Sequence, residues 1–151
     1  MPWNPITTQN VLDRFTPAEQ SVVSAIQGGA GTSLQNILND ACSQAQAMIL
    51  AGGNEIDQPG SVPDQIRPQV IAIALWEWIS SIPGAKQLCT DERKGLYDRA
   101  QKRLEAIASQ DPQREKIEPP QTPSAVPGAV GQAQFRADRR RMTHRQLSGL
   151  I

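Results

Sequence analysis

The chain has 151 residues and a formal net charge of zero, which suits one compact domain with an appendage. No apolar run approaches the roughly 20 residues that span a bilayer, because Glu77 interrupts the longest one, at residues 70–79, so we expect no membrane partner. The first residues lack the basic start and apolar run of a signal peptide, which indicates assembly in a cytoplasm. Cys42 and Cys89 have no CxxC or histidine companion, and we expect reduced thiols.

Composition changes abruptly near Asp111. Residues 1–111 contain 8 Lys and Arg against 12 Asp and Glu, whereas residues 112–151 contain 7 against 3. The net charges of the two parts are therefore −4 and +4. Five prolines lie between Pro112 and Pro127. We predict a helical body over residues 1–111 and an extended, Pro-rich and Arg-rich C-terminal arm over residues 112–151.

Capping signals and glycines divide the first half of the body into helices. Thr7 is the expected cap of a short helix that ends by Phe15, and residues 16–19 combine a capping Thr, a Pro and a Glu. We expect this second helix to stop at the glycine-rich residues 28–31. A third helix follows from Thr32 or Ser33 to Gly52-Gly53, with a 3.6-residue apolar period.

The second half continues the helical pattern. After a polar loop with a Pro59-Gly60 turn, residues 63–67 predict a single turn, and Pro68 begins a helix that reaches Ile82 and is apolar on nearly every side. Thr90 caps a last helix. The fold class is therefore all-α, a small bundle of about five helices. The buried stripe expected for the last helix contains Leu96, Tyr97, Ala100, Leu104 and Ile107, and the expected core contains Leu34, Ile37, Leu38, Ile71, Leu75, Trp76, Trp78 and Leu104.

Residues suited to catalysis are scarce. His144, the single histidine, lies in the arm, so the body of one chain cannot form a histidine triad or a histidine-rich metal site. Asp91 and Glu92 are adjacent and diverge around a helix, which favours stabilisation of the helix dipole. The glycines of residues 28–31 lack the Lys-Ser/Thr ending of a phosphate-binding loop. We expect no enzyme, no cofactor and no metal site.

The arm contains the one site-like cluster, Arg139-Arg140-Arg141. Its interpretations are a solvated charge run, docking on an acidic protein surface, or contact with nucleic acid. We favour docking on an acidic surface of another protein or of a neighbouring subunit, because the proline-rich spacer is long enough to leave the subunit of origin. The expected contact residues are Phe135, Arg136, Arg139, Arg140, Arg141, Met142, Leu147, Leu150 and Ile151.

The body contains a succession of short phrases: Trp3-Asn4-Pro5-Ile6-Thr7, Phe15-Thr16-Pro17-Ala18-Glu19, Gly52-Gly53, Val62-Pro63-Asp64-Gln65-Ile66-Arg67, Trp76-Glu77-Trp78 and Thr90-Asp91-Glu92-Arg93. In order and spacing they resemble the head-tail connector, or neck adaptor, proteins of tailed bacteriophages. The resemblance covers roughly residues 3–110. It implies a small α-helical virion protein that forms a ring, commonly of twelve copies, beneath the portal. Such a ring extends the DNA channel and offers a docking surface to later neck or tail proteins, while a C-terminal arm embraces the portal.

The charge pattern suits that function. A channel rich in Lys and Arg would hold DNA phosphates, whereas an acidic body lets DNA pass through the lumen without sequence-specific binding. The alternative is a small DNA-binding protein of the packaging machinery, similar to a terminase small subunit, that uses the Arg cluster on phosphates. A DNA-binding protein of this kind would show an affinity that falls steeply with salt.

Overall fold

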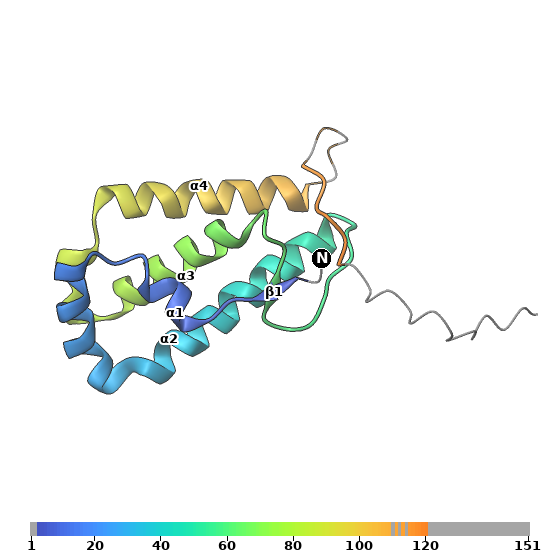
Figure 1. Ribbon diagram of the computed structural model, residues 1–151. Coiled ribbons are helices and arrows are strands. Elements are labelled where there is room, and N and C mark those ends of the chain that lie inside the picture. The colour runs from blue at the N-terminus through green and yellow to red at the C-terminus, as the bar shows by residue number, and fades with distance from the viewer. Residues whose placement is uncertain (1–2, 110, 112, 114, 121–151) are drawn as a thin grey trace, which may run out of the picture.

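The computed structural model describes residues 3–109, 111, 113 and 115–120, apart from the side chains of residues 26–33. The predicted all-α bundle is confirmed. Within the described residues, α3 packs against both α2 and α4, and α2 and α4 also touch (Figure 1). The elements in chain order are β1 (Asn4–Pro5), α1 (Thr8–Leu12), α2 (Pro17–Ala51), β2 (Ser61–Val62), α3 (Arg67–Ser81), the 3₁₀ helix η1 (Pro83–Leu88) and α4 (Asp91–Ala108).

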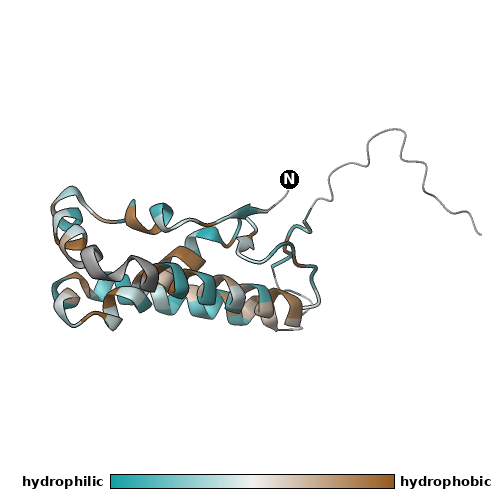
Figure 2. Cartoon of the chain, turned by 90° about the horizontal axis from the view of Figure 1, so that it is seen from below, coloured by the Kyte–Doolittle hydropathy of each residue, from teal (hydrophilic) through white to brown (hydrophobic). Residues whose placement is uncertain are grey.

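The core forms around α3, whose side chains are buried on most of its circumference. Teal and brown segments alternate along the long helices (Figure 2), as expected for helices with one apolar face. Trp78 is 1% exposed, and its ring meets Phe15 edge-on at 6.1 Å between centroids. Of the expected core residues, Leu34, Leu38, Ile71, Leu75, Trp78 and Leu104 are buried, whereas Ile37 and Trp76 are only partly buried. Trp76 lies at the edge of the core because it packs on Tyr97, with ring centroids 6.3 Å apart.

The break expected at residues 28–31 is wrong, since α2 is one helix of 35 residues that includes the glycines. Its first turns run at a steep angle to its C-terminal part (Figure 1). Each glycine costs a helix only about 0.5–1 kcal/mol relative to Ala. Val23 and Leu34, on either side of the glycines, are both buried. Packing of both flanking segments therefore maintains a helix that local propensity disfavours.

The helix starts predicted at Thr7, Thr16 and Thr90 are confirmed, whereas α3 begins at Arg67, one residue before the predicted Pro68, and the separate start predicted at Thr32 or Ser33 is wrong because α2 is continuous there. The Thr16 N–H donates to Glu19 Oε2 at 2.9 Å, while the Glu19 N–H donates to Thr16 Oγ1 at 3.4 Å, which forms a capping box. Thr90 Oγ1 accepts from the Arg93 N–H at 3.3 Å. The Ile66 N–H donates to the Pro63 carbonyl at 3.1 Å, which forms the expected single turn before α3.

Glycine also shapes the end of α2. Gly53 has a φ of 81°, and the Asn54 N–H donates to the Ile49 carbonyl at 3.1 Å, the backbone pattern of a Schellman cap. Beside it, a Cβ on Gly52 would collide with the Ile107 carbonyl oxygen. The ends of α2 and α4 therefore approach backbone to backbone. This contact requires a residue without a side chain.

A short antiparallel ribbon, β1 with β2, holds the N-terminal segment on the bundle. Gln46, which is buried on α2, donates from Nε2 to the carbonyls of Gln58 at 2.8 Å and Ser61 at 2.7 Å. The Pro59-Gly60 turn is confirmed, since Gly60 has a φ of 83° and the Ser61 N–H donates to the Gln58 carbonyl at 3.1 Å. The ribbon lacks the period-two apolar pattern of a longer strand, which explains why the sequence did not indicate it.

Contacts with the body continue past Asp111, where the sequence predicts the arm to begin. Ile117 is buried, and the Trp3 indole Nε1 donates to the Glu118 carbonyl at 3.2 Å. Arg103 binds Glu115 through two hydrogen bonds of 2.9 and 2.6 Å. With the boundary moved to Pro120, residues 1–120 contain 10 Lys and Arg against 14 Asp and Glu, and residues 121–151 contain 5 against 1. The charge separation of −4 and +4 is unchanged.

The two cysteines are free thiols. Cys42 is 1% exposed on α2, and burial raises the pKa of its thiol to about 11. Cys89 is only partly buried, after η1. No helix in the described part of the chain is both long and apolar enough to cross a membrane.

Candidate functional site: an apolar groove with an arginine rim

The contact residues expected in the arm, from Phe135 to Ile151, lie outside the described residues and remain predictions. The candidate site that the structure describes is on the body. A pocket of about 300 Å³ opens where the end of α1, the middle of α3 and the first turns of α4 meet. Its lining is Arg14, Pro68, Ile71, Ala72, Leu75, Arg93 and Leu96.

A second hollow of about 460 Å³ adjoins this pocket. The two share Arg14, Pro68 and Ile71, so they form one continuous depression, which we call the groove. The floor of the groove is mainly aliphatic. The second hollow adds polar groups at one end, from Asn10, Asp13, Asp64 and Arg67.

Leu96 is 46% exposed, so the buried stripe expected for α4 is wrong at this position. Ala100, Leu104 and Ile107 are buried as expected, and Tyr97 is partly buried. Helical periodicity identifies the face of α4 to which Leu96 belongs, but it does not indicate whether another segment covers this side chain. Leu96 instead forms part of the wall of the groove.

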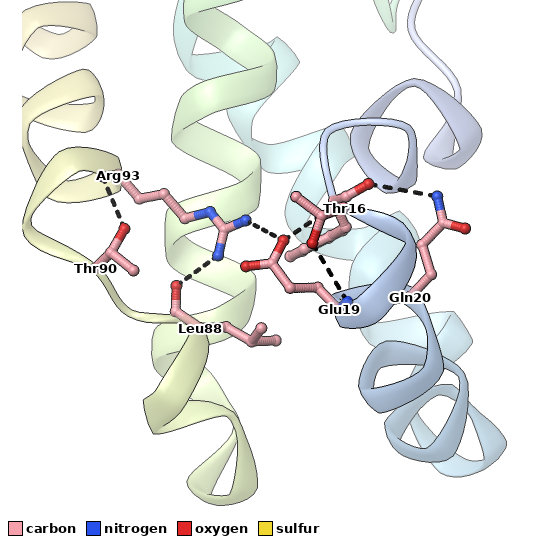
Figure 3. A network of polar contacts seen from close by, with 7 residues as sticks. Thr16, Glu19, Gln20, Leu88, Thr90 and Arg93 are labelled. Atoms are coloured by element: carbon pink, nitrogen blue, oxygen red, sulfur yellow. Dashed lines mark hydrogen bonds and ion pairs between the residues drawn. The ribbon is translucent and has the colours of Figure 1, made fainter.

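Arg93 lines the groove, and its guanidinium already binds two acceptors within the body (Figure 3). Its guanidinium donates to Glu19 Oε2 at 2.8 Å and to the Leu88 carbonyl at 2.8 Å. The guanidinium carbon also lies 5.1 Å from the centre of the Phe15 ring, in the range of a cation–π contact. The hydrogen bond from Arg93 is the main cause that lowers the pKa of Glu19 to about 2. This network joins the starts of α2 and α4.

The other two arginines of the groove differ from each other. Arg67 donates to the Pro5 carbonyl at 3.4 Å and to Asn10 Oδ1 at 3.1 Å, and it lies 4.0 Å from Asp64. Arg14 is exposed at the rim and has no hydrogen-bond or ion-pair partner for its side chain among the described residues. Arg14 is therefore the rim cation that is available to an incoming anion.

Two further large apolar side chains are exposed on a different part of the body, at and just after the end of α2. Leu50 is 57% exposed in the last turn of α2, and Ile56 is 40% exposed in the loop that follows. Glu55 lies beside Ile56 and is also exposed. We call Leu50, Glu55 and Ile56 the ridge.

The described residues contain no group of three or more His, Cys, Asp or Glu side chains able to hold a metal ion. The pKa of Glu77 is raised, first by burial and then by the nearby charge of Asp40. The aliphatic floor of the groove is suited to binding a partly apolar surface.

A scan against protein-family models, a search of curated proteins and a search of solved structures each found no match. Sequence reasoning also missed the groove, whose residues come from three separate segments. The only local signal is a leucine, Leu96, among charged and polar neighbours at the start of α4.

Proposed function

We propose that the chain is a structural subunit of the head-tail neck of a tailed bacteriophage. Copies form a ring beneath the portal, commonly of twelve subunits. The ring extends the DNA channel and receives a downstream neck or tail protein. The proposed location is the virion, after assembly in the host cytoplasm. The subunit catalyses no reaction and needs no cofactor.

The observation that carries this proposal is the anchored start of the arm. Trp3 and Gln65 hold Glu118, since Trp3 Nε1 donates to its carbonyl at 3.2 Å and the Glu118 N–H donates to Gln65 Oε1 at 3.2 Å. Buried Ile117 fixes the neighbouring backbone. Residues 115–118 are therefore held on the body, beside the N-terminal segment (Figure 1). A fixed origin gives a docking arm the same starting position in every subunit.

Charge separation supports the same function. A net charge of −4 on residues 1–120 weakens attraction to DNA phosphates, which favours passage of DNA through the ring. The net charge of +4 on residues 121–151 favours an acidic surface on another protein. Arginine also adds orientation, because its guanidinium binds a carboxylate through two hydrogen bonds. Arg139, Arg140 and Arg141 are the proposed docking cations.

The test is attachment to the portal protein of the same phage. The full chain is expected to form a ring on portal particles that negative-stain microscopy resolves. A chain truncated after Pro120 is expected to keep its helical circular dichroism and to attach at least about tenfold more weakly. Changing Arg139, Arg140 and Arg141 to Glu is expected to weaken attachment more than changing them to Ala. Equal attachment of the truncated and full chains would contradict the role of the arm.

The arginine cluster also motivates the second candidate, a small DNA-binding protein of the packaging machinery. The distinguishing measurement is fluorescence anisotropy of a labelled duplex between 50 and 200 mM salt. A DNA-binding arm that contacts several phosphates loses orders of magnitude in affinity over this range. A connector arm is expected to show weak binding to free duplex and to require the portal. Tight, steeply salt-dependent duplex binding would favour the packaging protein.

A further inference from the structure

We propose that the ridge of one copy of this chain binds in the groove of the next copy. Leu50 and Ile56 would meet the aliphatic floor of the groove beside Leu96, while Glu55 would pair with Arg14. The partner is thus a second copy of the same chain. This inference rests on the proposed ring-forming function and assigns its subunit contact.

The first argument is the exposed apolar surface. Within the described residues, the large hydrophobic side chains that are exposed are Leu50 at 57%, Ile56 at 40% and Leu96 at 46%. Leu96 lines the groove, and the other two form the ridge. A single kind of contact between copies would cover all three side chains. Covering exposed apolar patches in this way is a common basis of subunit association.

The second argument is charge. Arg67 lies beside Asp64 and hydrogen-bonds to Asn10, and Arg93 is bound to Glu19, so neither is free to meet a partner. Arg14 has no such side-chain partner among the described residues. The ridge offers a matching anion, since Glu55 is exposed and no described residue binds its carboxylate.

The neighbouring acid, Asp57, is less available than Glu55. Its carboxylate accepts from the N–H groups of Trp3 at 3.3 Å and Gln58 at 2.8 Å. The ridge therefore presents one free carboxylate next to two exposed apolar side chains. The part of the groove beside Leu96 presents one free guanidinium, that of Arg14, on an aliphatic floor, whereas Asp13 and Asp64 line the other end. The two surfaces are complementary in both respects.

The third argument is symmetry. The groove and the ridge share no residue: the groove opens between α1 and the start of α4, whereas the ridge lies at the end of α2, near the end of α4 (Figure 1). A contact between two different patches is heterologous, so an open chain of subunits keeps one free groove at one end and one free ridge at the other until it closes. Such contacts generate rings when the rotation closes.

Two other occupants suit the groove less well. Residues 121–151 contain 5 Lys and Arg against 1 Asp and Glu, so their charge would repel Arg14. A DNA backbone would meet a mainly aliphatic floor with one free cation, where little of its charge is neutralised. A second copy is the occupant that the exposed residues favour.

The test exchanges the paired charges. Sedimentation velocity of the full chain, alone and with portal particles, measures self-association. Arg14→Glu and Glu55→Arg are each expected to weaken association at least about tenfold, because each places like charges together. A variant carrying both changes is expected to recover to within about threefold of the original chain. Lys102→Glu is the matched control, an equal charge reversal at an exposed position outside the groove.

The folding of each single variant is checked first. Each is expected to retain the circular dichroism and melting temperature of the original chain. Association that is insensitive to both single changes, or that the double variant fails to restore, would overturn the contact.

A chain truncated after Pro120 should still self-associate in solution, and loss comparable to that of Arg14→Glu would assign the groove to the arm. Rings that form on the portal regardless of Arg14 and Glu55 would retain the proposed function and reject this contact. If the double variant recovers self-association but the chain does not attach to the portal, the proposed function is rejected and the contact between copies is retained.

Discussion

Two arginines of the groove, Arg93 and Arg14, have different roles. Arg93 stabilises the fold, whereas Arg14 is free to bind a partner. Arg93 holds Glu19, the Leu88 carbonyl and the Phe15 ring in one corner of the bundle. Arg14 lines the same groove and holds no described side chain. The same residue type therefore stabilises the body in one place and remains available in the other. The contacts of each arginine, rather than its residue type, therefore indicate its role.

Leucines on α4 show the same contrast. Leu104 is fully buried between helices, whereas Leu96, two turns earlier, is 46% exposed. The apolar periodicity of α4 predicts that both side chains are buried. The difference arises from the tertiary structure, since Leu104 is enclosed by the bundle whereas Leu96 lines an open pocket. Variants at these positions therefore separate effects on stability from effects on association.

The largest expected effect is on the core. Leu104→Ala is expected to lower the free energy of unfolding by about 2–5 kcal/mol, because it leaves a cavity at a fully buried site. Leu96→Ala, on the same helix, should change it by less than about 0.5 kcal/mol in the monomer. Urea unfolding of both variants measures the difference. Similar losses at the two positions would remove the distinction between core and groove.

Gly52→Ala is expected to cost about 1–3 kcal/mol, since its new methyl group would collide with the Ile107 carbonyl and push α2 from α4. Gly95→Ala is the control in the interior of α4, where a Cβ meets nothing within 4 Å. This control should raise stability by up to about 1 kcal/mol through helix propensity. Thermal unfolding of both variants tests the close approach. A neutral Gly52→Ala would show that the helix ends separate easily.

Glu19→Gln tests the contribution of the Glu19–Arg93 ion pair to stability through its pH dependence. We expect a loss of about 1–2 kcal/mol at pH 7, where the carboxylate hydrogen-bonds to Arg93. The pKa of Glu19 is lowered from 4.5 to about 2, so its contribution is complete above roughly pH 5 and disappears as the pH falls from 4.5 to 2. The stability difference between the two proteins should shrink over this range. A difference independent of pH would mean that the ion pair is not its cause.

The smallest expected effect is at the start of the arm. Trp3→Phe keeps an aromatic ring but removes the indole N–H that donates to the Glu118 carbonyl. The expected loss is about 0.5–1 kcal/mol, because Glu118 is exposed and water can replace the donor. Hydrogen exchange should accelerate at the Glu118 amide and stay unchanged in the middle of α4. Unchanged exchange at Glu118 would show that Trp3 does not hold this segment.

Sequence patterns predicted the elements whose cause is local. The capping box of Thr16 and Glu19 and the cap at Thr90 depend on residues three apart, so they can be recognised without a tertiary structure. The Pro59-Gly60 turn has an equally local cause. The strongly apolar α3 also indicated a surrounded helix correctly.

Features that depend on distant segments were missed. The glycines at residues 28–31 suggested a break, but tertiary packing on both sides maintains the helix. Prolines near residue 112 suggested the start of the arm, although Trp3 binds Glu118 across 115 residues of sequence. The groove combines α1, α3 and α4, so no single stretch of sequence encodes it. The arginine cluster predicted in the arm remains a prediction.

The buried thiol of Cys42 gives the chain an internal chemical reporter. Only a thiolate reacts quickly with an alkylating agent, and this thiol is both enclosed and, with a pKa of about 11, protonated at neutral pH. Cys89, which is less enclosed, should therefore be modified first. The later modification of Cys42 would then record how often α2 separates from the bundle. The natural sequence thus permits a kinetic measurement of core opening without an introduced label.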